Sequence, residues 1–224
     1  LEPDNPRLGQ YIGWIHWRKV TLGISKNAKE DMKKAYNYAL DALEKNENWL
    51  TPYTAVALIE LYSGKIDQAC SRLEKMNKIT NNASQEISYK ALIQHSCDDL
   101  TGAKSSYEKI FQINPHHESW IKYMYGYVLT ELKEYEDAKQ YISEQLKNDF
   151  SRAGVQQILY ITLAYIHEKE GNKNLAKKTF DLQKEKDGKG ISADQIHRRF
   201  ITKKNKSLLD DIIKTFEPYG LPDK

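Results

Sequence analysis

Residues that could bind a metal, or act together as nucleophile and base, occur at two places in this sequence. His116, His117 and Glu118 are adjacent, so their side chains diverge at the start of a helix, whereas a zinc-binding helix places its histidines four residues apart. His95 and Cys97 are two residues apart and point to different sides of a helix. The sequence has no phosphate-binding glycine loop, no Gly-x-Ser-x-Gly elbow and no paired-cysteine zinc motif. We therefore expect a chain without catalytic residues, metal or cofactor.

A basic block lies near the end of the chain. Between Lys184 and Lys206, eight Lys or Arg residues stand against three acidic residues, a local net charge of +5, while the whole chain carries +3. Clustered cations can bind phosphates. The candidates for a nucleic-acid accessory surface are Arg198, Arg199, Lys203, Lys204 and Lys206. A charge run of this size is more often a solvated face, so nucleic acid is the less favoured partner.

The elements that would position these residues are set by an internal repeat. Alanine recurs at positions 35, 69, 103, 138 and 176, in steps of 34, 34, 35 and 38, and each alanine is followed four residues later by an apolar or small residue. This spacing is one face of a helix. Twelve residues before four of these alanines lies another small residue, at positions 57, 91, 126 and 164. Small residues at both places allow two antiparallel helices to approach closely.

Breaker or acidic residues separate the two small positions of each unit, so a tight turn is expected there. These turn sequences are Ser63-Gly64-Lys65, Asp98-Asp99, Lys133-Glu134 and Gly171-Asn172. In the first unit Gly13 and Ala35 are 22 residues apart, which inserts about ten residues around Thr21 to Asp31. We expect a longer loop or extra helical turns at that insertion.

This pattern resembles the tetratricopeptide repeat over roughly residues 1–187. The resemblance implies an all-α solenoid of about five helix-turn-helix repeats, with units at about 5–47, 48–81, 82–115, 116–150 and 155–187. Pro115 stands where the consensus proline ends a second helix, and Pro3 falls where the closing proline of a repeat preceding the first unit would be. The chain is therefore expected to begin in mid-array.

Residues 188–224 are expected to form a C-terminal capping pair of helices. Asp187-Gly188-Lys189-Gly190 breaks the last repeat helix, and Ser192 with Gln195 predicts a capping box at the start of a new one. A second apolar stripe runs from Leu208 to Phe216 and stops at Pro218 and Gly220. A solenoid needs such a cap because its last apolar face would otherwise be exposed.

The resemblance also implies a binding surface, since the first helices of successive tetratricopeptide units line a concave groove. The groove positions carried over in register are Gln10, Trp14, Trp17, Arg18, Thr54, Leu58, Leu61, Tyr62, Ser88, Leu92, His95, Trp120, Tyr123, Tyr127, Glu131, Ile161, Tyr165 and Glu168. The candidate ligand-binding residues among them are Trp14, Trp17, Arg18, Tyr62, His95, Trp120, Tyr123, Tyr127 and Tyr165. Rigid aromatic rings with few polar neighbours suit an extended peptide or a helix, so a protein or peptide is the expected ligand. The alternative is that a helix of this chain covers them.

Repeats that clamp the acidic C-termini of chaperones place Lys and Asn at set groove positions. Gln10, Trp14 and Leu58 stand at the corresponding positions here, which disfavours that class of ligand.

Cys70 and Cys97 lie one repeat apart at helical positions. They are either small buried residues or a disulfide, and two cysteines form no disulfide framework in 224 residues. The cytoplasm is favoured as the compartment and the periplasm is left open. No stretch of about 18 apolar residues could span a membrane, so no membrane contact is expected.

Three stretches resemble a narrower group of proteins. Residues 1–6 (Leu-Glu-Pro-Asp-Asn-Pro), 11–23 and 206–222 resemble the C-terminal repeat region of bacterial multidomain adenylate/guanylate cyclases, and related regions follow winged-helix domains in some bacterial transcription regulators. The resemblance implies a regulatory, partner-binding module joined to an upstream output domain. It implies no cyclase activity here, because no segment resembles the cyclase catalytic domain. The other hypotheses are a nucleic-acid accessory surface and a structural module that forms a homo-oligomer.

Overall fold

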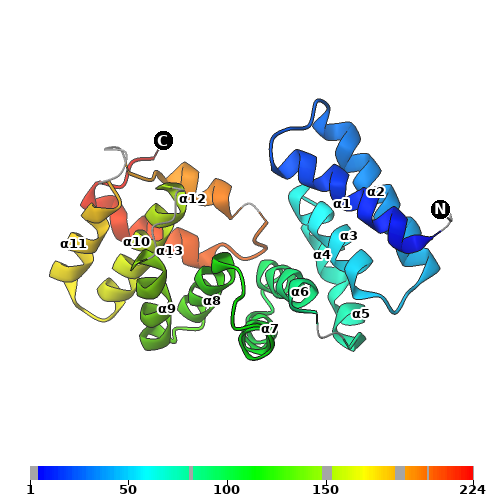
Figure 1. The fold of residues 1–224 in the computed structure, drawn as a ribbon. Helices are drawn as coiled ribbons and strands as arrows, with labels where there is room; N and C mark the ends of the chain where they lie inside the picture. The colour runs from blue at the N-terminus through cyan, green and yellow to red at the C-terminus, as the bar shows by residue number, and fades with distance from the viewer. Residues whose placement is uncertain (1–4, 81–82, 148–152, 185–189, 201, 224) are drawn as a thin grey trace.

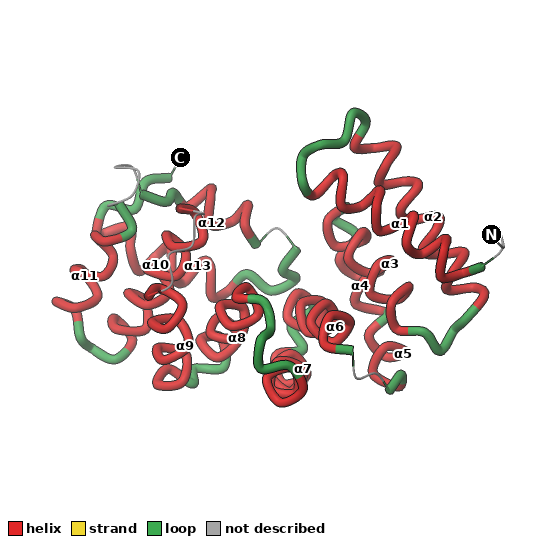
Figure 2. Tube along the Cα trace, in the orientation of Figure 1, coloured by secondary structure: helices red, strands yellow, loops and turns green. Residues whose placement is uncertain are grey.

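The computed structural model describes residues 5–80, 83–147, 153–184, 190–200 and 202–223, and this part of the chain is helical, without a strand. Figures 1 and 2 show the helices up to residue 182 arranged in chain order along an arc, with the two later helices lying back toward its middle. They pair as α1 (Pro6–Thr21) with α2 (Ala28–Lys45), α3 (Leu50–Tyr62) with α4 (Ile66–Ser71) and α5 (Leu73–Lys78), α6 (Ser84–Ser96) with α7 (Leu100–Ile113), α8 (Ser119–Glu131) with α9 (Tyr135–Lys147), and α10 (Ala153–Lys169) with α11 (Lys173–Leu182). The last elements are α12 (Ala193–Arg199), α13 (Ser207–Phe216) and the 3-10 turn Glu217–Tyr219. This is the predicted all-α solenoid of tetratricopeptide type.

The small residues of the repeat lie where paired helices touch. The five alanines at 35, 69, 103, 138 and 176 are at most 1% exposed, as are those at 57, 91 and 164. At Gly126 an added Cβ would lie 2.9 Å from Cγ1 of Ile142, and at Gly13 it would lie 3.2 Å from the carbonyl oxygen of Ala35. Larger side chains at these positions would force the helices apart.

One type of turn joins the two helices in four of the units. One residue of each turn lies in the left-handed region, with φ of +76° for Gly64, +70° for Asp98, +62° for Lys133 and +80° for Gly171. In every case its N–H donates to the carbonyl three residues back, and the next N–H donates to the carbonyl five residues back, over 2.8–3.2 Å. This is the Schellman arrangement that ends a helix.

The first and second units depart from the regular pair. Helices α1 and α2 have 16 and 18 residues, against 13 in α3, so the insertion near Thr21 adds helical turns as well as the connection at 22–27. The second helix of the second unit is divided at Arg72 into α4 and α5. The guanidinium of Arg72 donates two hydrogen bonds of 2.7 Å to the buried carboxylate of Glu60.

The last two helices pack on the last repeat unit. The predicted capping box forms, because the Ser192 and Gln195 side chains each accept a hydrogen bond from the other residue's backbone N–H. Phe216 of α13 stacks on Phe180 of α11, with ring centroids 4.8 Å apart. Residues 1–4, which include Pro3, and 187–189 of the predicted break lie outside the described residues.

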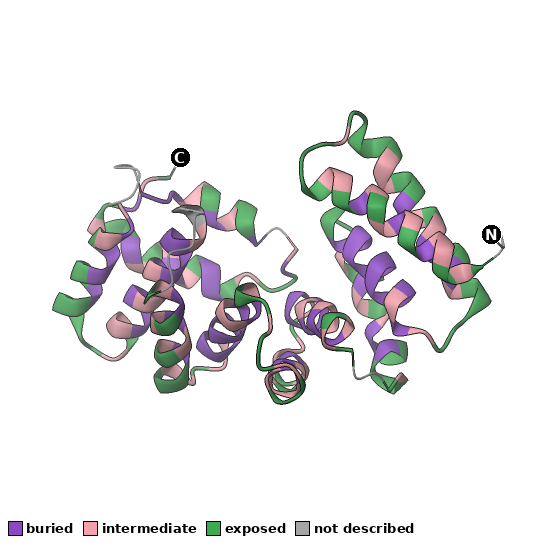
Figure 3. Cartoon of the chain, in the orientation of Figure 1, coloured by how far each residue is buried: buried purple, intermediate pink, exposed green. Residues whose placement is uncertain are grey.

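The arc has a concave side, which opens at the top of Figure 1 between α1 and α12. Buried residues gather on α3, α6, α8 and α10, the first helices of their units (Figure 3). These helices lie between the second helices and the concave side, which explains why so few of their residues are exposed.

Candidate functional site

A cavity of about 580 Å³ lies on the concave side of the arc. Its walls come from α1, α3, α6, α8, α10 and the end of α12, and from the residues that follow α12. The lining residues used below are Trp17, Arg18, Tyr62, Tyr89, His95, Glu118, Trp120, Tyr123, Arg199, Phe200 and Lys203. The first helices therefore build the groove, as the repeat pattern predicts.

An aromatic row, consisting of Trp14, Trp17, Tyr62, Tyr89 and Trp120, connects four helices along this groove. The ring centroids of Trp14 and Trp17 are 4.7 Å apart, and those of Trp14 and Tyr89 are 5.2 Å apart. Tyr89 stacks on Trp120 at 6.3 Å, and Trp17 lies 6.5 Å from Tyr62. Contacts of this geometry hold the rings in place, so the row is a preformed apolar surface.

Polar groups border the aromatic row. Arg18 and Arg199 line the cavity, and the indole Nε1 of Trp120 donates to the carboxylate of Glu118. The buried Nε1 of Trp17 finds no acceptor among the described residues.

The chain itself fills the other half of the groove. The ring of Phe200 stacks on Tyr127 with centroids 4.5 Å apart. The Nζ of Lys203 donates to the carbonyl oxygen of His95 at 2.9 Å and to Oε2 of Glu131 at 3.0 Å. Residues 202–206 continue along the end of α6. We call Phe200 and residues 202–206 together the C-terminal segment.

The ion pair beneath this segment is buried. Lys203 is 3% exposed, and the side chain of Glu131 is 8% exposed. Burial opposes ionisation of Glu131, but hydrogen bonds from His95 and Lys203 outweigh it and lower its pKa. Burial lowers the pKa of His95, so its ring is neutral at pH 7. Since a carboxylate only accepts, Nε2 of His95 donates to Oε2 of Glu131, at 2.6 Å.

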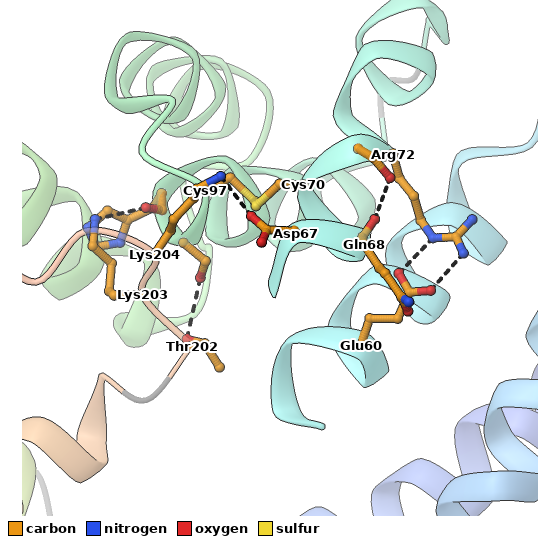
Figure 4. The surroundings of a disulfide bond; sticks show 12 residues. Glu60, Asp67, Gln68, Cys70, Arg72, Cys97, Thr202, Lys203 and Lys204 are labelled. Carbon is orange, nitrogen blue, oxygen red and sulfur yellow. Dashed lines mark hydrogen bonds and ion pairs between the residues drawn. A yellow bond between two sulfur atoms is a disulfide. The ribbon is translucent and has the colours of Figure 1, made fainter. Parts of the chain in front are cut away.

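A disulfide joins Cys70 of α4 to Cys97 at the end of α6, with Cα atoms 5.5 Å apart. The sequence left this bridge undecided. Figure 4 shows Thr202, Lys203 and Lys204 beside it. The bridge thus connects two of the elements against which the C-terminal segment lies, since the segment also contacts α8.

Further hydrogen bonds of the C-terminal segment end within three residues of one of the two cysteines. The backbone N–H of Lys204 donates to the carbonyl of Ser96 at 2.8 Å, and its Nζ lies 2.8 Å from Oδ1 of Asp67. Asn205 donates to Asp98 at 3.3 Å. The segment is therefore held by main-chain as well as side-chain bonds.

The structure separates the sequence-based site residues into two groups. Six of them line the cavity, namely Trp17, Arg18, Tyr62, His95, Trp120 and Tyr123. Trp14 lines an adjoining depression with Arg18 and Glu118. Tyr127 and Tyr165 lie instead in the core, 3% and 4% exposed, because Phe200 covers the first and the hydroxyl of the second donates to Asp211 of α13 at 2.6 Å. For these two, the alternative of a covering segment from the same chain holds.

The groove residues that sequence reasoning missed include Tyr89, Glu118, Arg199, Phe200 and Lys203. Tyr89 lies one position beyond the expected Ser88, and an aromatic residue beside a groove position is a signal that could have found it. Lys203 was assigned to the basic block, where nothing in the local sequence distinguishes a buried lysine from exposed ones.

Among the candidates for a nucleic-acid surface, Lys203 is buried and therefore cannot contribute to it. Lys204 pairs with Asp67, and Arg198 pairs with Asp194 at 2.7 Å, but both pairs are exposed to solvent.

Of the histidines considered for metal binding, His117 packs its ring on Phe111, with centroids 4.8 Å apart. Over the described residues, no group of three or more His, Cys, Asp or Glu side chains is placed to hold a metal ion. None of the described helices is long and apolar enough to cross a membrane.

Comparison with known proteins agrees with this architecture. Residues 121–151 match the model of the tetratricopeptide repeat. None of the curated proteins compared matches the sequence significantly. The fold defines the chain as an α-solenoid of tetratricopeptide type.

Several solved structures share this fold. A MamA protein is 17% identical with a TM-score of 0.58, over 82% of this chain and 92% of MamA. PilF of Pseudomonas aeruginosa is 15% identical with a TM-score of 0.57, over 91% and 89% of the two chains. YrrB, described as a tetratricopeptide protein with an unusual peptide-binding site, is 18% identical with a TM-score of 0.52, over 81% and 93%. At these identities the likeness shows the fold, and none of these comparisons shows a cyclase or winged-helix relationship.

Proposed function

We propose that this chain is a non-catalytic interaction module that binds a peptide segment of a partner protein in its concave groove. The observation that carries the proposal is that a peptide already lies there: the C-terminal segment uses ring stacking, a lysine and a main-chain N–H to bind the inner helices. The rest of the groove offers the same kinds of group. Aromatic rings give large contact area at low entropic cost, which suits peptide recognition.

Within this proposal, the aromatic row and its neighbours bind the partner. Trp17 and Trp120 would supply the apolar contact, and Arg18 and Arg199 would meet carbonyl or carboxylate groups. YrrB has a peptide-binding site on the same fold, which supports this use of the scaffold. Residues 1–187 would act as the binding array and 188–224 as its cap.

The test uses one groove variant and one matched control. Partners retained from an extract of the native host by the full chain are identified, purified and titrated by calorimetry. Trp120→Ala should weaken binding about 10- to 100-fold, as expected for a central aromatic contact. Leu175→Ala removes an apolar side chain of α11, 45% exposed and outside the lining of the groove, and should leave affinity within about twofold. Equal affinity of the Trp120→Ala variant and the native chain would contradict the proposal.

The parent context is a separate proposal. The resemblance of residues 206–222 to the repeat region of bacterial cyclases suggests a signalling parent, in which partner binding biases an upstream output domain. This rests on the sequence resemblance alone. The translated gene upstream of Leu1 tests it, since an unrelated upstream domain would remove this context without affecting the binding groove.

The disulfide bears on the compartment. Structural disulfides persist in oxidising environments and are rare in the cytosol of mesophiles. The bridge between Cys70 and Cys97 therefore favours the periplasmic alternative over the cytoplasmic expectation. Alkylation of thiols in intact cells tests this, because a cytoplasmic chain would be modified at both cysteines.

A homo-oligomer is the second candidate function, and one observation favours it. Tyr11, Ile15, Leu22 and Ile24, in and just after α1, are 54–68% exposed. An exposed apolar group of this kind is typical of an interaction surface. Sedimentation equilibrium should then show dimers that Ile15→Lys dissociates, whereas a concentration-independent monomer would exclude this function.

A further inference from the structure

The C-terminal segment has the form of a bound ligand. Its backbone turns back at once, because the N–H of Lys203 donates to the carbonyl of Phe200 at 3.0 Å. The two side chains of this turn occupy neighbouring receptor sites, one on the ring of Tyr127 and the other at Glu131. An aromatic residue followed three positions later by a lysine therefore fits this half of the groove.

The lysine site selects for positive charge. Its acceptors are the carboxylate of Glu131 and the carbonyl of His95, and its walls are nearly dry, since His95 is 1% exposed. The neutral ring of His95 donates to the same carboxylate. A buried carboxylate without a cation is unfavourable, so anything that replaces Lys203 must bring a cation of its own.

The occupied and open halves of the groove are continuous. One cavity is lined both by Phe200 and Lys203 and by Trp17 and Trp120. A partner that first contacts the aromatic row would therefore lie next to the C-terminal segment. Exchange at the shared boundary needs no other opening in the fold.

We propose that the C-terminal segment is an internal ligand that competes with a basic partner peptide, in which an aromatic residue precedes a lysine by three positions. The partner's lysine replaces Lys203 at Glu131, and its aromatic ring replaces Phe200 on Tyr127. This deepens the proposed function, on which it rests, by naming the chemistry of the partner. The intramolecular segment acts at a high effective concentration, so it keeps weak basic peptides out.

The test uses a fluorescein-labelled octapeptide with the sequence of residues 199–206, Arg-Phe-Ile-Thr-Lys-Lys-Asn-Lys, and the full chain. Fluorescence anisotropy compares the native chain with the double variant Phe200→Ala/Lys203→Ala. The variant should bind the peptide at least tenfold more tightly, because the internal competitor is weakened. A folded double variant that binds no more tightly than the native chain would overturn the proposal.

Two altered peptides separate the lysine site from general charge attraction. One carries Gln in place of the lysine that corresponds to Lys203, and the other carries Gln in place of the lysine that corresponds to Lys204; both have the same net charge. The first should bind at least tenfold more weakly than the second, since Lys204 reaches Asp67, whose side chain is 87% exposed. Equal binding of the two peptides would overturn the proposal, while Trp120-dependent partner binding could still stand.

Hydrogen exchange of the native chain decides the matter if the double variant does not fold. The amide of Lys204, bonded to Ser96, should exchange through local release of the segment, far faster than buried amides of α8 such as that of Val128. Millimolar octapeptide should accelerate this exchange. If the amide of Lys204 exchanges only when the whole chain unfolds, the C-terminal segment is a permanent part of the cap, and the proposal is overturned.

Discussion

The Nζ of Lys203 lies 3.0 Å from Oε2 of Glu131, although the two residues are 72 positions apart in the sequence. This ion pair joins the chain after α12 to the end of α8, inside the concave face. It shows that part of the groove is occupied by the chain's own peptide and that the occupied part is selective for a cation. The open part retains the aromatic row.

Loss of Lys203 should destabilise the fold. Lys203→Ala leaves the carboxylate of Glu131 without its cation, and we expect the free energy of unfolding to fall by about 2–3 kcal/mol, because the segment can move out and admit water. Urea denaturation measures it. Lys204→Ala is the matched control: its pair with Asp67 is solvent-exposed, so the loss should stay under about 1 kcal/mol. Equal losses of stability in the two variants would contradict burial of the pair between Lys203 and Glu131.

Acid should weaken the fold through His95 before it protonates Glu131. Burial lowers the pKa of His95 in the folded chain, so the unfolded chain binds more protons below pH about 6.5 and the free energy of unfolding decreases as pH falls. Glu131 and Lys203 lie at its ring, with Asp98 nearby. The lowered pKa of Glu131 confines its own contribution to more acidic pH.

The contribution of His95 can be isolated by substitution. Unfolding by urea at pH 7.5 and 5.5 should show a smaller difference for His95→Gln than for the native chain. His167, whose pKa burial also lowers, contributes with the same sign, so His167→Gln serves for comparison. An unchanged pH difference in His95→Gln would show that His95 is not buried in its neutral form.

Removing the disulfide should lower stability by about 3 kcal/mol, the value expected when a loop of this size is no longer closed in the unfolded chain. Cys70 and Cys97 are 27 positions apart. Denaturant titration of Cys70→Ala/Cys97→Ala, compared with the oxidised native chain, measures the difference. Coincident unfolding midpoints would indicate that the bridge does not form in solution.

The turn after α8 offers a stabilising substitution. Lys133 has φ +62°, a conformation that is strained for a residue with a Cβ. Lys133→Gly should raise the free energy of unfolding by up to about 1 kcal/mol, less the extra entropy that glycine gives the unfolded chain. Gly171→Ala, at φ +80°, should lower it by about 1 kcal/mol. If Lys133→Gly lowered the free energy of unfolding and Gly171→Ala raised it, the left-handed backbone of these turns would be contradicted.

The fold could be predicted because the same packing constraint recurs in each repeat unit. The alanine at 103 must be small where two helices touch, and the same holds 34 residues earlier at 69. The turns could also be located, although Lys133 at positive φ contradicts its local preference. There the surrounding helices determine the backbone.

The occupied groove could not be predicted, for a physical reason. The contacts of Lys203 join residues 72 and 108 positions apart, and no periodic pattern reports such contacts. A lysine within a basic block is expected to be solvated, so burial of Lys203 contradicts the local sequence. The pairing of Cys70 with Cys97 likewise depended on how α4 lies against α6.

The most direct measurement of the central claim is fluorine NMR of the full chain labelled with fluorotryptophan, titrated with a partner identified by retention. Trp17 and Trp120 belong to the aromatic row and line the groove, whereas Trp49 lines only the adjoining depression. We predict that the resonances of Trp17 and Trp120 shift on binding, and that they shift more than that of Trp49. A partner that binds without shifting Trp17 or Trp120 would contradict recognition in the concave groove.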